Sequence, residues 1–161
     1  MTEAVSDVQI WPTIRAEAQR DAEREPCLAG FLNETILRHQ TLMDALGSLL
    51  AHKLASPTMS ALTLLDLAEE AFERDPLIAE SVIADLQAII SRDPATRGYS
   101  QPLLYFKGFH AIQAFRIAHH FWVTDRTALA LFLQSRISEV FAVDIHPGAR
   151  IGKGIMFDHA T

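Results

Sequence analysis

The feature that most constrains this chain is a change in the spacing of its apolar residues near position 141. Before that position, apolar residues recur every three or four residues, as they do in amphipathic helices. After it, one apolar residue recurs at every sixth position, at Ile145, Ile151 and Phe157. Glycine also becomes frequent, with three of the seven glycines in the last 14 residues. The sequence therefore predicts a helical domain over residues 1–141 and a different architecture over residues 142–161.

Proline and capping residues divide the helical part into about seven helices. Trp11-Pro12 predicts the start of the first helix, because proline is tolerated in a first turn, and Pro26 predicts its end. Residues 28–54 contain one or two more helices, with a break near His39-Gln40. Ser60 is the predicted N-cap of the helix that follows, because serine accepts a hydrogen bond from the first-turn amides.

The second half of the helical part has the same organisation. Asp75-Pro76 again pairs a capping residue with a proline, and residues 91–101 predict a connection because they contain proline and glycine. Residues 103–122 predict one long and almost wholly apolar helix, and apolar residues over 129–141 predict a last one. Short loops favour antiparallel neighbours. The predicted fold class is therefore mostly α, with an antiparallel helical bundle.

The six-residue recurrence after position 141 is typical of hexapeptide repeats in a parallel β-helix. In such repeats the apolar side chain points into the prism, and Gly152 is expected to allow a tight corner. The letters IHPGAR, IGKGIM and FDHAT make two repeats and part of a third, which is one incomplete coil. Stacked repeats need about three units to be stable, so residues 142–161 are expected to begin something longer. A glycine-rich tail that only resembles repeats is the alternative.

Charge and cysteine content limit the possible partners and compartment. Residues 1–100 hold 8 basic and 16 acidic side chains, and residues 101–161 hold 6 and 4. The acidic first half repels phosphate backbones, so no nucleic-acid partner is expected. No stretch approaches the roughly 18 apolar residues of a membrane span. A single cysteine, Cys27, excludes a disulfide scaffold and fits a reducing cytoplasm. We expect a soluble cytoplasmic chain.

Three stretches of the sequence resemble one known family. The run VDIHPGARIGKGIMFDHAT (residues 143–161) is similar to the first β-helix coil of bacterial serine O-acetyltransferases, and KGFHAIQAFRIAHHFW (residues 107–122) resembles that family's last long helices. The opening pattern also matches, at Trp11, Ile14, Arg15, Glu17, Ala18 and Glu25-Pro26. The resemblance covers essentially the whole chain, which is therefore interpreted as the N-terminal portion of such an enzyme.

The resemblance implies an enzyme of cysteine biosynthesis that transfers the acetyl group of acetyl-CoA to the hydroxyl of L-serine. It implies acetyl-CoA as a co-substrate, no permanently bound cofactor and no metal. The β-helix is left-handed and trimerises in this family, and the helical domains join two trimers into a hexamer. L-cysteine is a possible feedback inhibitor. Most of the acetyl-CoA site, and the C-terminal tail that docks O-acetylserine sulfhydrylase, are expected to lie beyond Thr161. The chain by itself is expected to self-associate with little activity.

The same resemblance suggests four site residues. His159 matches the catalytic base, and Asp144 matches the acid that pairs with its imidazole. Asp158 and Asp93 match the carboxylates that bind the ammonium group of serine. Without the resemblance, His159 would be a lone loop histidine and Asp144 a helix terminator. Asp93 precedes a proline, so a capping role is its simplest explanation from sequence.

Other residue clusters are weaker candidates. His110, His119 and His120 lack metal-binding spacing, because neighbouring residues point to different faces of a helix, so packing is expected. Cys27 has no catalytic motif around it. Two other functions stay open from the sequence, namely a helical oligomerisation module without catalysis and a hexapeptide acyltransferase with a different acceptor.

Overall fold

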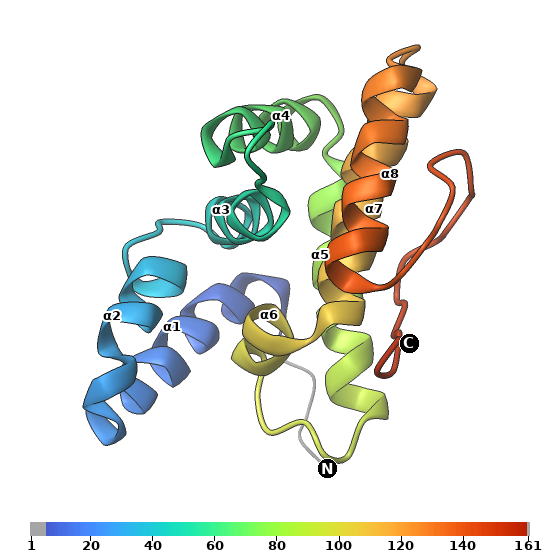
Figure 1. The fold of residues 1–161 in the computed structure, drawn as a ribbon. Coiled ribbons are helices and arrows are strands. Elements are labelled where there is room, and N and C mark those ends of the chain that lie inside the picture. The colour runs from blue at the N-terminus through green and yellow to red at the C-terminus, as the bar shows by residue number, and fades with distance from the viewer. Residues whose placement is uncertain (1–5, 161) are drawn as a thin grey trace.

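The computed structural model describes residues 6–160, and most of these residues are helical (Figure 1). A 3-10 turn (Pro26–Leu28) precedes the second helix and a π-helical turn (Asn33–Leu37) follows it. The α-helices are α1 (Asp7–Arg24), α2 (Ala29–Leu32), α3 (Leu42–Leu54), α4 (Ala61–Arg74), α5 (Leu77–Arg92), α6 (Ser100–Tyr105), α7 (Lys107–Val123) and α8 (Thr127–Phe141). Within the described range none of these helices is long and apolar enough to cross a bilayer.

The helices surround a shared apolar core. In Figure 1, α5, α7 and α8 run side by side, while α3 and α4 form a second pair beside them. The α7–α8 pair is an antiparallel hairpin closed by a short turn at residues 124–126. After α8 the chain continues without helix along the outer side of α5 and α7, where its red trace is visible. This extended segment, residues 142–160, is called the tail below.

Several predicted helix boundaries are confirmed. The Ser60 hydroxyl accepts the Thr63 amide at 3.2 Å and caps α4. Asp75 accepts the Leu77 amide at 3.2 Å at the start of α5. The predicted break near His39-Gln40 lies between the π-helical turn and α3. The two capping signals work because each depends on a side chain and a backbone amide only two or three residues away.

The predicted start of the first helix is wrong. The helix begins at Asp7, so Trp11-Pro12 lies inside α1 and does not open it. Proline in a helix removes one backbone hydrogen bond. Ile10 and Ile14, on either side of the pair, are 1% and 0% exposed. Burial of these two side chains compensates for the missing bond, which is a tertiary effect that local signals do not report.

The single helix predicted over residues 103–122 is divided in two. Phe106 adopts an extended conformation, with φ −89° and ψ 106°, and separates α6 from α7. In a continuous helix the Leu103 carbonyl would accept the amide four residues later. Here it is paired instead with Nε2 of His110, at 2.7 Å. This side-chain bond compensates for the backbone bond that the break removes. With the break, the described range contains eight α-helices.

The tail contains no strand within residues 142–160. A strand needs a neighbour to pair with, and a single coil has no stacked coil beside it. Ile145 and Phe157, two of the residues expected to face a prism interior, are half-buried against the helical core. The glycine with positive φ in the tail is Gly154, at 76°, and the corner expected at Gly152 stays a prediction together with the coil. The β-helix itself therefore stays a prediction.

Candidate functional site

The tail reaches the candidate site by lying along α5 and α7. Near its middle, the Ile155 amide donates to Asp85 Oδ1 at 2.8 Å, and Arg92 Nη1 donates to the Gly154 carbonyl at 2.8 Å. Nearer α8, the His119 ring is 2.7 Å from the Pro147 carbonyl. These contacts bring the last residues of the tail to the end of α5.

Three of the four predicted site residues line one cavity there. Asp93, at the C-terminal end of α5, faces Asp158 and His159 of the tail across a cavity of about 560 Å³. The remaining lining comes from α5 and the loop after it, from α6, from the start of α7 and from the tail. Asp93 is separated from the other two by more than sixty positions in the sequence, so the fold alone brings them together.

The Asp93 carboxylate is fixed by its own turn. One oxygen accepts the Ala95 amide at 2.9 Å, and the other accepts the Thr96 hydroxyl at 2.7 Å. The Thr96 hydroxyl and the Ala95 amide, with a smaller effect of His159, hold the pKa of this carboxyl below its ordinary value. Asp93 therefore has the capping contacts expected from its sequence and also presents a negative charge to the cavity.

His159 projects from a tight bend in the tail. His159 and Ala160 have φ values of 56° and 49°, and the Ala160 amide donates to the Asp158 carbonyl at 2.6 Å. The His159 imidazole, 95% exposed, lies 3.7 Å from the Asp158 carboxylate. A neutral imidazole has a ring nitrogen that can accept a proton from a bound substrate, and the nearby carboxylate favours the resulting positive charge.

Gly108 lets the tail approach the start of α7. A Cβ at this position would lie 2.9 Å from Phe157 Cβ and would also meet the Phe157 carbonyl. Only glycine, which has no side chain, leaves space here for the backbone of Phe157. Phe157 lies two residues before His159 in the tail. The sequence showed this glycine, but no local pattern distinguished it from any other helical glycine.

Asp144 lies in a different place. Its carboxylate accepts Gln134 Nε2 at 2.9 Å and lines a separate depression beside α8. Asp144 is not among the residues that line the cavity of Asp93 and His159. The pairing of Asp144 with the His159 imidazole thus stays a prediction.

The three histidines of α7 that the sequence analysis considered lie in or beside the helical core. His110 is 1% exposed, and burial lowers its pKa to about 4. His119 contacts the tail and His120 packs edge-on against Phe121. Within the described range, no three His, Cys, Asp or Glu side chains lie close enough together to hold a metal.

A buried polar cluster supports the tail, and sequence reasoning missed it. Asp85 Oδ2 accepts Arg116 Nη2 at 2.6 Å and Gln113 Nε2 at 2.7 Å, while Arg116 Nε donates to Gln113 Oε1 at 3.1 Å. Asp85 is 0% exposed. A signal existed, because Asp85 lies three residues after Val82 and four before Ile89, on the apolar stripe of α5.

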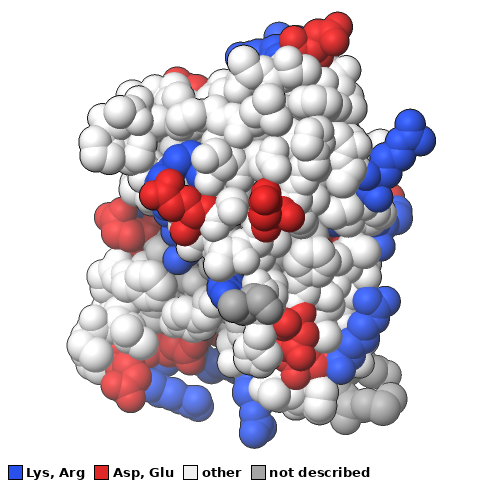
Figure 2. Space-filling view, turned by 45° about the vertical axis from the view of Figure 1, so that its right-hand side comes forward, with Lys and Arg blue, Asp and Glu red and all other residues white. Residues whose placement is uncertain are grey.

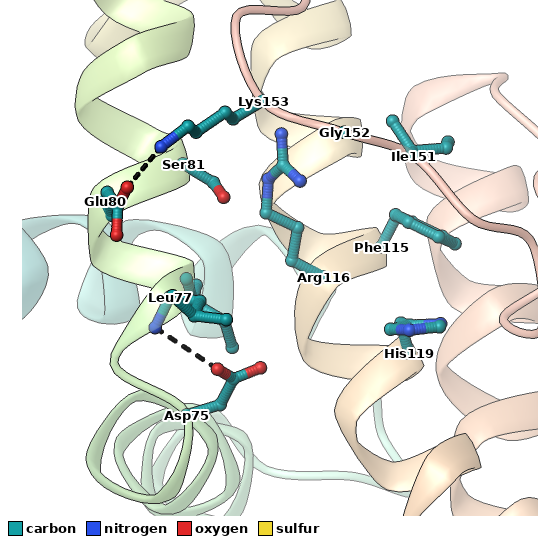
Figure 3. Close-up of a pocket in the computed structure, with 11 residues that line it drawn as sticks. Asp75, Leu77, Glu80, Ser81, Phe115, Arg116, His119, Ile151, Gly152 and Lys153 are labelled. Carbon is teal, nitrogen blue, oxygen red and sulfur yellow. Dashed lines mark hydrogen bonds and ion pairs between the residues drawn. The ribbon is translucent and has the colours of Figure 1, made fainter.

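A second cavity, of about 380 Å³, lies beside this cluster between α5, α7 and the tail. Figure 3 shows Lys153 of the tail paired with Glu80 of α5 across its mouth, and Arg116 pointing between α5 and the tail. None of the predicted site residues lines it.

On the face shown in Figure 2, charges of both signs are scattered over a largely uncharged surface, without a continuous basic patch.

Fold and cavity together define a class of protein, an α-helical domain with an extended glycine-containing tail that carries an Asp-His pair. The chain belongs to the serine acetyltransferase family, since the family model "Serine acetyltransferase, N-terminal" matches residues 10–114. A curated serine acetyltransferase of Haemophilus influenzae is 54% identical over 154 residues, which are 96% of this chain and 58% of the relative.

Solved structures agree with this membership. A serine acetyltransferase in complex with CoA is 54% identical with a TM-score of 0.94, over 96% of this chain and 66% of that one. The serine complex of the Neisseria gonorrhoeae enzyme is 53% identical with a TM-score of 0.92, over 94% and 63%. The chain thus spans between half and two thirds of the length of these relatives.

Proposed function

We propose that this chain is the helical portion of an acetyl-CoA-dependent serine O-acetyltransferase, a transferase of cysteine biosynthesis. The observation that carries the proposal is the convergence of Asp93, Asp158 and His159 on one cavity. Two carboxylates suit the ammonium group of an amino acid, and an imidazole suits the proton of its hydroxyl. The serine and CoA complexes of the solved relatives support the same two substrates.

The reaction needs a base because a serine hydroxyl is a poor nucleophile at neutral pH. His159 takes the hydroxyl proton while the serine oxygen attacks the thioester carbonyl of acetyl-CoA. The tetrahedral intermediate then expels the CoA sulfur, which receives that proton from the imidazolium. The products are O-acetyl-L-serine and CoA. Asp144 is proposed to stabilise the imidazolium once the complete protein has assembled.

The remaining parts of the proposal concern domain organisation, assembly and partners. Residues 1–141 form the helical oligomerisation domain, and residues 142–161 begin a left-handed β-helix that completes the acetyl-CoA site. Subunits are proposed to assemble as a dimer of trimers in the cytoplasm, with O-acetylserine sulfhydrylase docked on a C-terminal tail. L-cysteine carries the same ammonium and carboxylate groups as serine, so it is proposed to compete for Asp93 and Asp158.

The test uses the protein expressed from its complete reading frame, incubated with acetyl-CoA and L-serine. Mass spectrometry is expected to detect O-acetyl-L-serine, and free thiol is expected to appear at the same rate. L-threonine and L-homoserine serve as controls for the acceptor. Acetylation of another acceptor with none of serine would indicate a different hexapeptide acyltransferase. Self-association without any acetylation would indicate the non-catalytic oligomerisation module.

A further inference from the structure

The buried cluster between α5 and α7 makes a bond that its packing role does not require. Asp85 is saturated on one oxygen by Arg116 and Gln113, both of α7. Its other oxygen accepts the backbone amide of Ile155, seventy positions away in the tail. A cluster that only joined two helices would have no need of this third partner.

We propose that Asp85 is a positioning residue, which holds the tail backbone at Ile155 and thereby places Asp158 and His159 opposite Asp93. What the placed residues do rests on the proposed function. Arg116 and Gln113 act through Asp85, because their hydrogen bonds hold its carboxylate in one orientation. None of the three lines the cavity itself.

The lengths of the two elements support this role. The α5 helix rises about 1.5 Å per residue, so Asp93 lies about 12 Å along it from Asp85. An extended chain covers at most about 3.6 Å per residue, so His159 reaches at most about 14 Å from Ile155. The two spans end at the same cavity. A slip of the tail by one helical turn, about 5.4 Å, would separate His159 from Asp93.

Burial of the Asp85 cluster distinguishes this contact from the exposed polar contacts of the tail. Asp85 and Arg116 are 0% and 7% exposed, so water does not compete for their hydrogen bonds. The Arg92–Gly154 bond and the Lys153–Glu80 pair are exposed, and exposed pairs contribute little. Asp85 therefore sets the position of the tail, and the exposed contacts follow.

Two variants test the proposal from opposite sides. The triple variant D85L/Q113L/R116M replaces the whole cluster by apolar side chains, so that no buried charge is left without a partner. The variant I155P instead removes the donor from the tail and changes no helical residue. The matched control is E17Q. Glu17 is another buried carboxylate that accepts backbone amides, at Tyr99 and Ser100, but its partners lie outside the tail.

The first readout is structural and independent of activity. Amide exchange at Ile155 is expected to be at least tenfold faster in the triple variant and to change less than threefold in E17Q. The nuclear Overhauser effect between Gly108 and Phe157 is expected to disappear in the triple variant and in I155P. Should the triple variant fail to fold, I155P decides by itself. Retention of this signal in I155P, or unchanged exchange in a folded triple variant, would overturn the proposal.

The second readout is kinetic and uses the complete protein. Displacement of a catalytic group by about 1 Å can lower a rate about 100-fold. In both variants kcat is expected to fall at least tenfold, while the KM for acetyl-CoA changes less than threefold. Unchanged kcat despite a displaced tail would refute the placement of His159 by Asp85. A wild-type protein with no acetyltransferase activity would refute the proposed function, while the structural readout would still judge the anchoring.

Discussion

The helical domain and the tail are held in place by different forces. Helices α1 to α8 share a core of fully buried apolar side chains, of which Phe121 and Leu86 are 0% exposed. In the tail, only Val143 and Pro147 are buried, and the residues of the six-residue repeat are half-exposed. Its position comes from hydrogen bonds to α5 and α7, with partial packing of Ile145, Met156 and Phe157 against the helical core. The helical domain thus contains its own stabilising core, and the tail takes its conformation from the surface beneath it.

The candidate site lies where these two regions meet. Asp93 belongs to the end of α5, and Asp158 and His159 belong to the tail. Substitutions in the helical core should therefore lower stability, whereas substitutions in the tail should lower activity without unfolding the domain. Four measurements test this division, in order of decreasing effect.

The largest effect is expected for H159A in the complete protein. Loss of a general base lowers kcat by about 100- to 10,000-fold. The melting temperature should not change, because the His159 side chain is 95% exposed. D144A should lose less, since Asp144 is proposed only to stabilise the imidazolium. H52A, at an exposed position of α3, is the matched control. Near-wild-type turnover of H159A would contradict both the proposed base and the division of roles.

F121A should affect stability in the helical domain. Removal of a fully buried phenylalanine lowers the free energy of unfolding by about 3–5 kcal/mol. The change is measured by urea unfolding followed by circular dichroism. L131A, on the exposed face of α8, is the control and should change it by about 0.5 kcal/mol or less. Equal losses in the two variants would show that the core is not where the stability lies.

Acidification should weaken the helical domain through His110. Burial lowers the pKa of His110 to about 4, well below the ordinary value of 6.5. Between about pH 6.5 and about pH 4 the unfolded chain therefore binds a proton at His110 that the folded chain does not bind. The free energy of unfolding falls as the pH drops from about 6.5 towards about 4. The loss is about 3 kcal/mol over that window.

The measurement is the free energy of unfolding at pH 7 and at pH 4.5, compared between the wild type and H110Q. Glutamine keeps a donor for the Leu103 carbonyl but has no proton to gain, so the pH dependence should become shallower. H52Q, at an exposed position, should retain the wild-type slope. A slope that is the same in all three proteins would exclude His110 as its source.

The smallest effect on stability is expected for G108A. An added Cβ meets the Phe157 backbone and should lift the end of the tail, while α7 changes by less than about 1 kcal/mol. Trypsin cleavage after Lys153 should become faster at an unchanged melting temperature. G30A is the control, because nothing lies within 4 Å of a Cβ there. Equal cleavage of G108A and G30A would show that the tail does not depend on this contact.

Local signals predicted much of the helical domain. Ser60 and Asp75 were recognisable as caps because their partners lie within three residues. The break at Phe106 was not recognisable, because the bond that stabilises it joins His110 to Leu103 and depends on the packing around both. The early start of α1 was missed for the same reason, since buried Ile10 and Ile14 outweigh the local effect of Pro12.

The sequence by itself determined the helical class of residues 1–141, the change of architecture after them and the family resemblance from which the site residues were named. These are properties of spacing and of short motifs, which act over a few residues. Only the tertiary structure decided that Asp93 meets His159, that Asp85 holds the tail and that Asp144 lies apart. Such arrangements involve positions tens of residues apart, and they form only when the helices have packed and the tail lies against them.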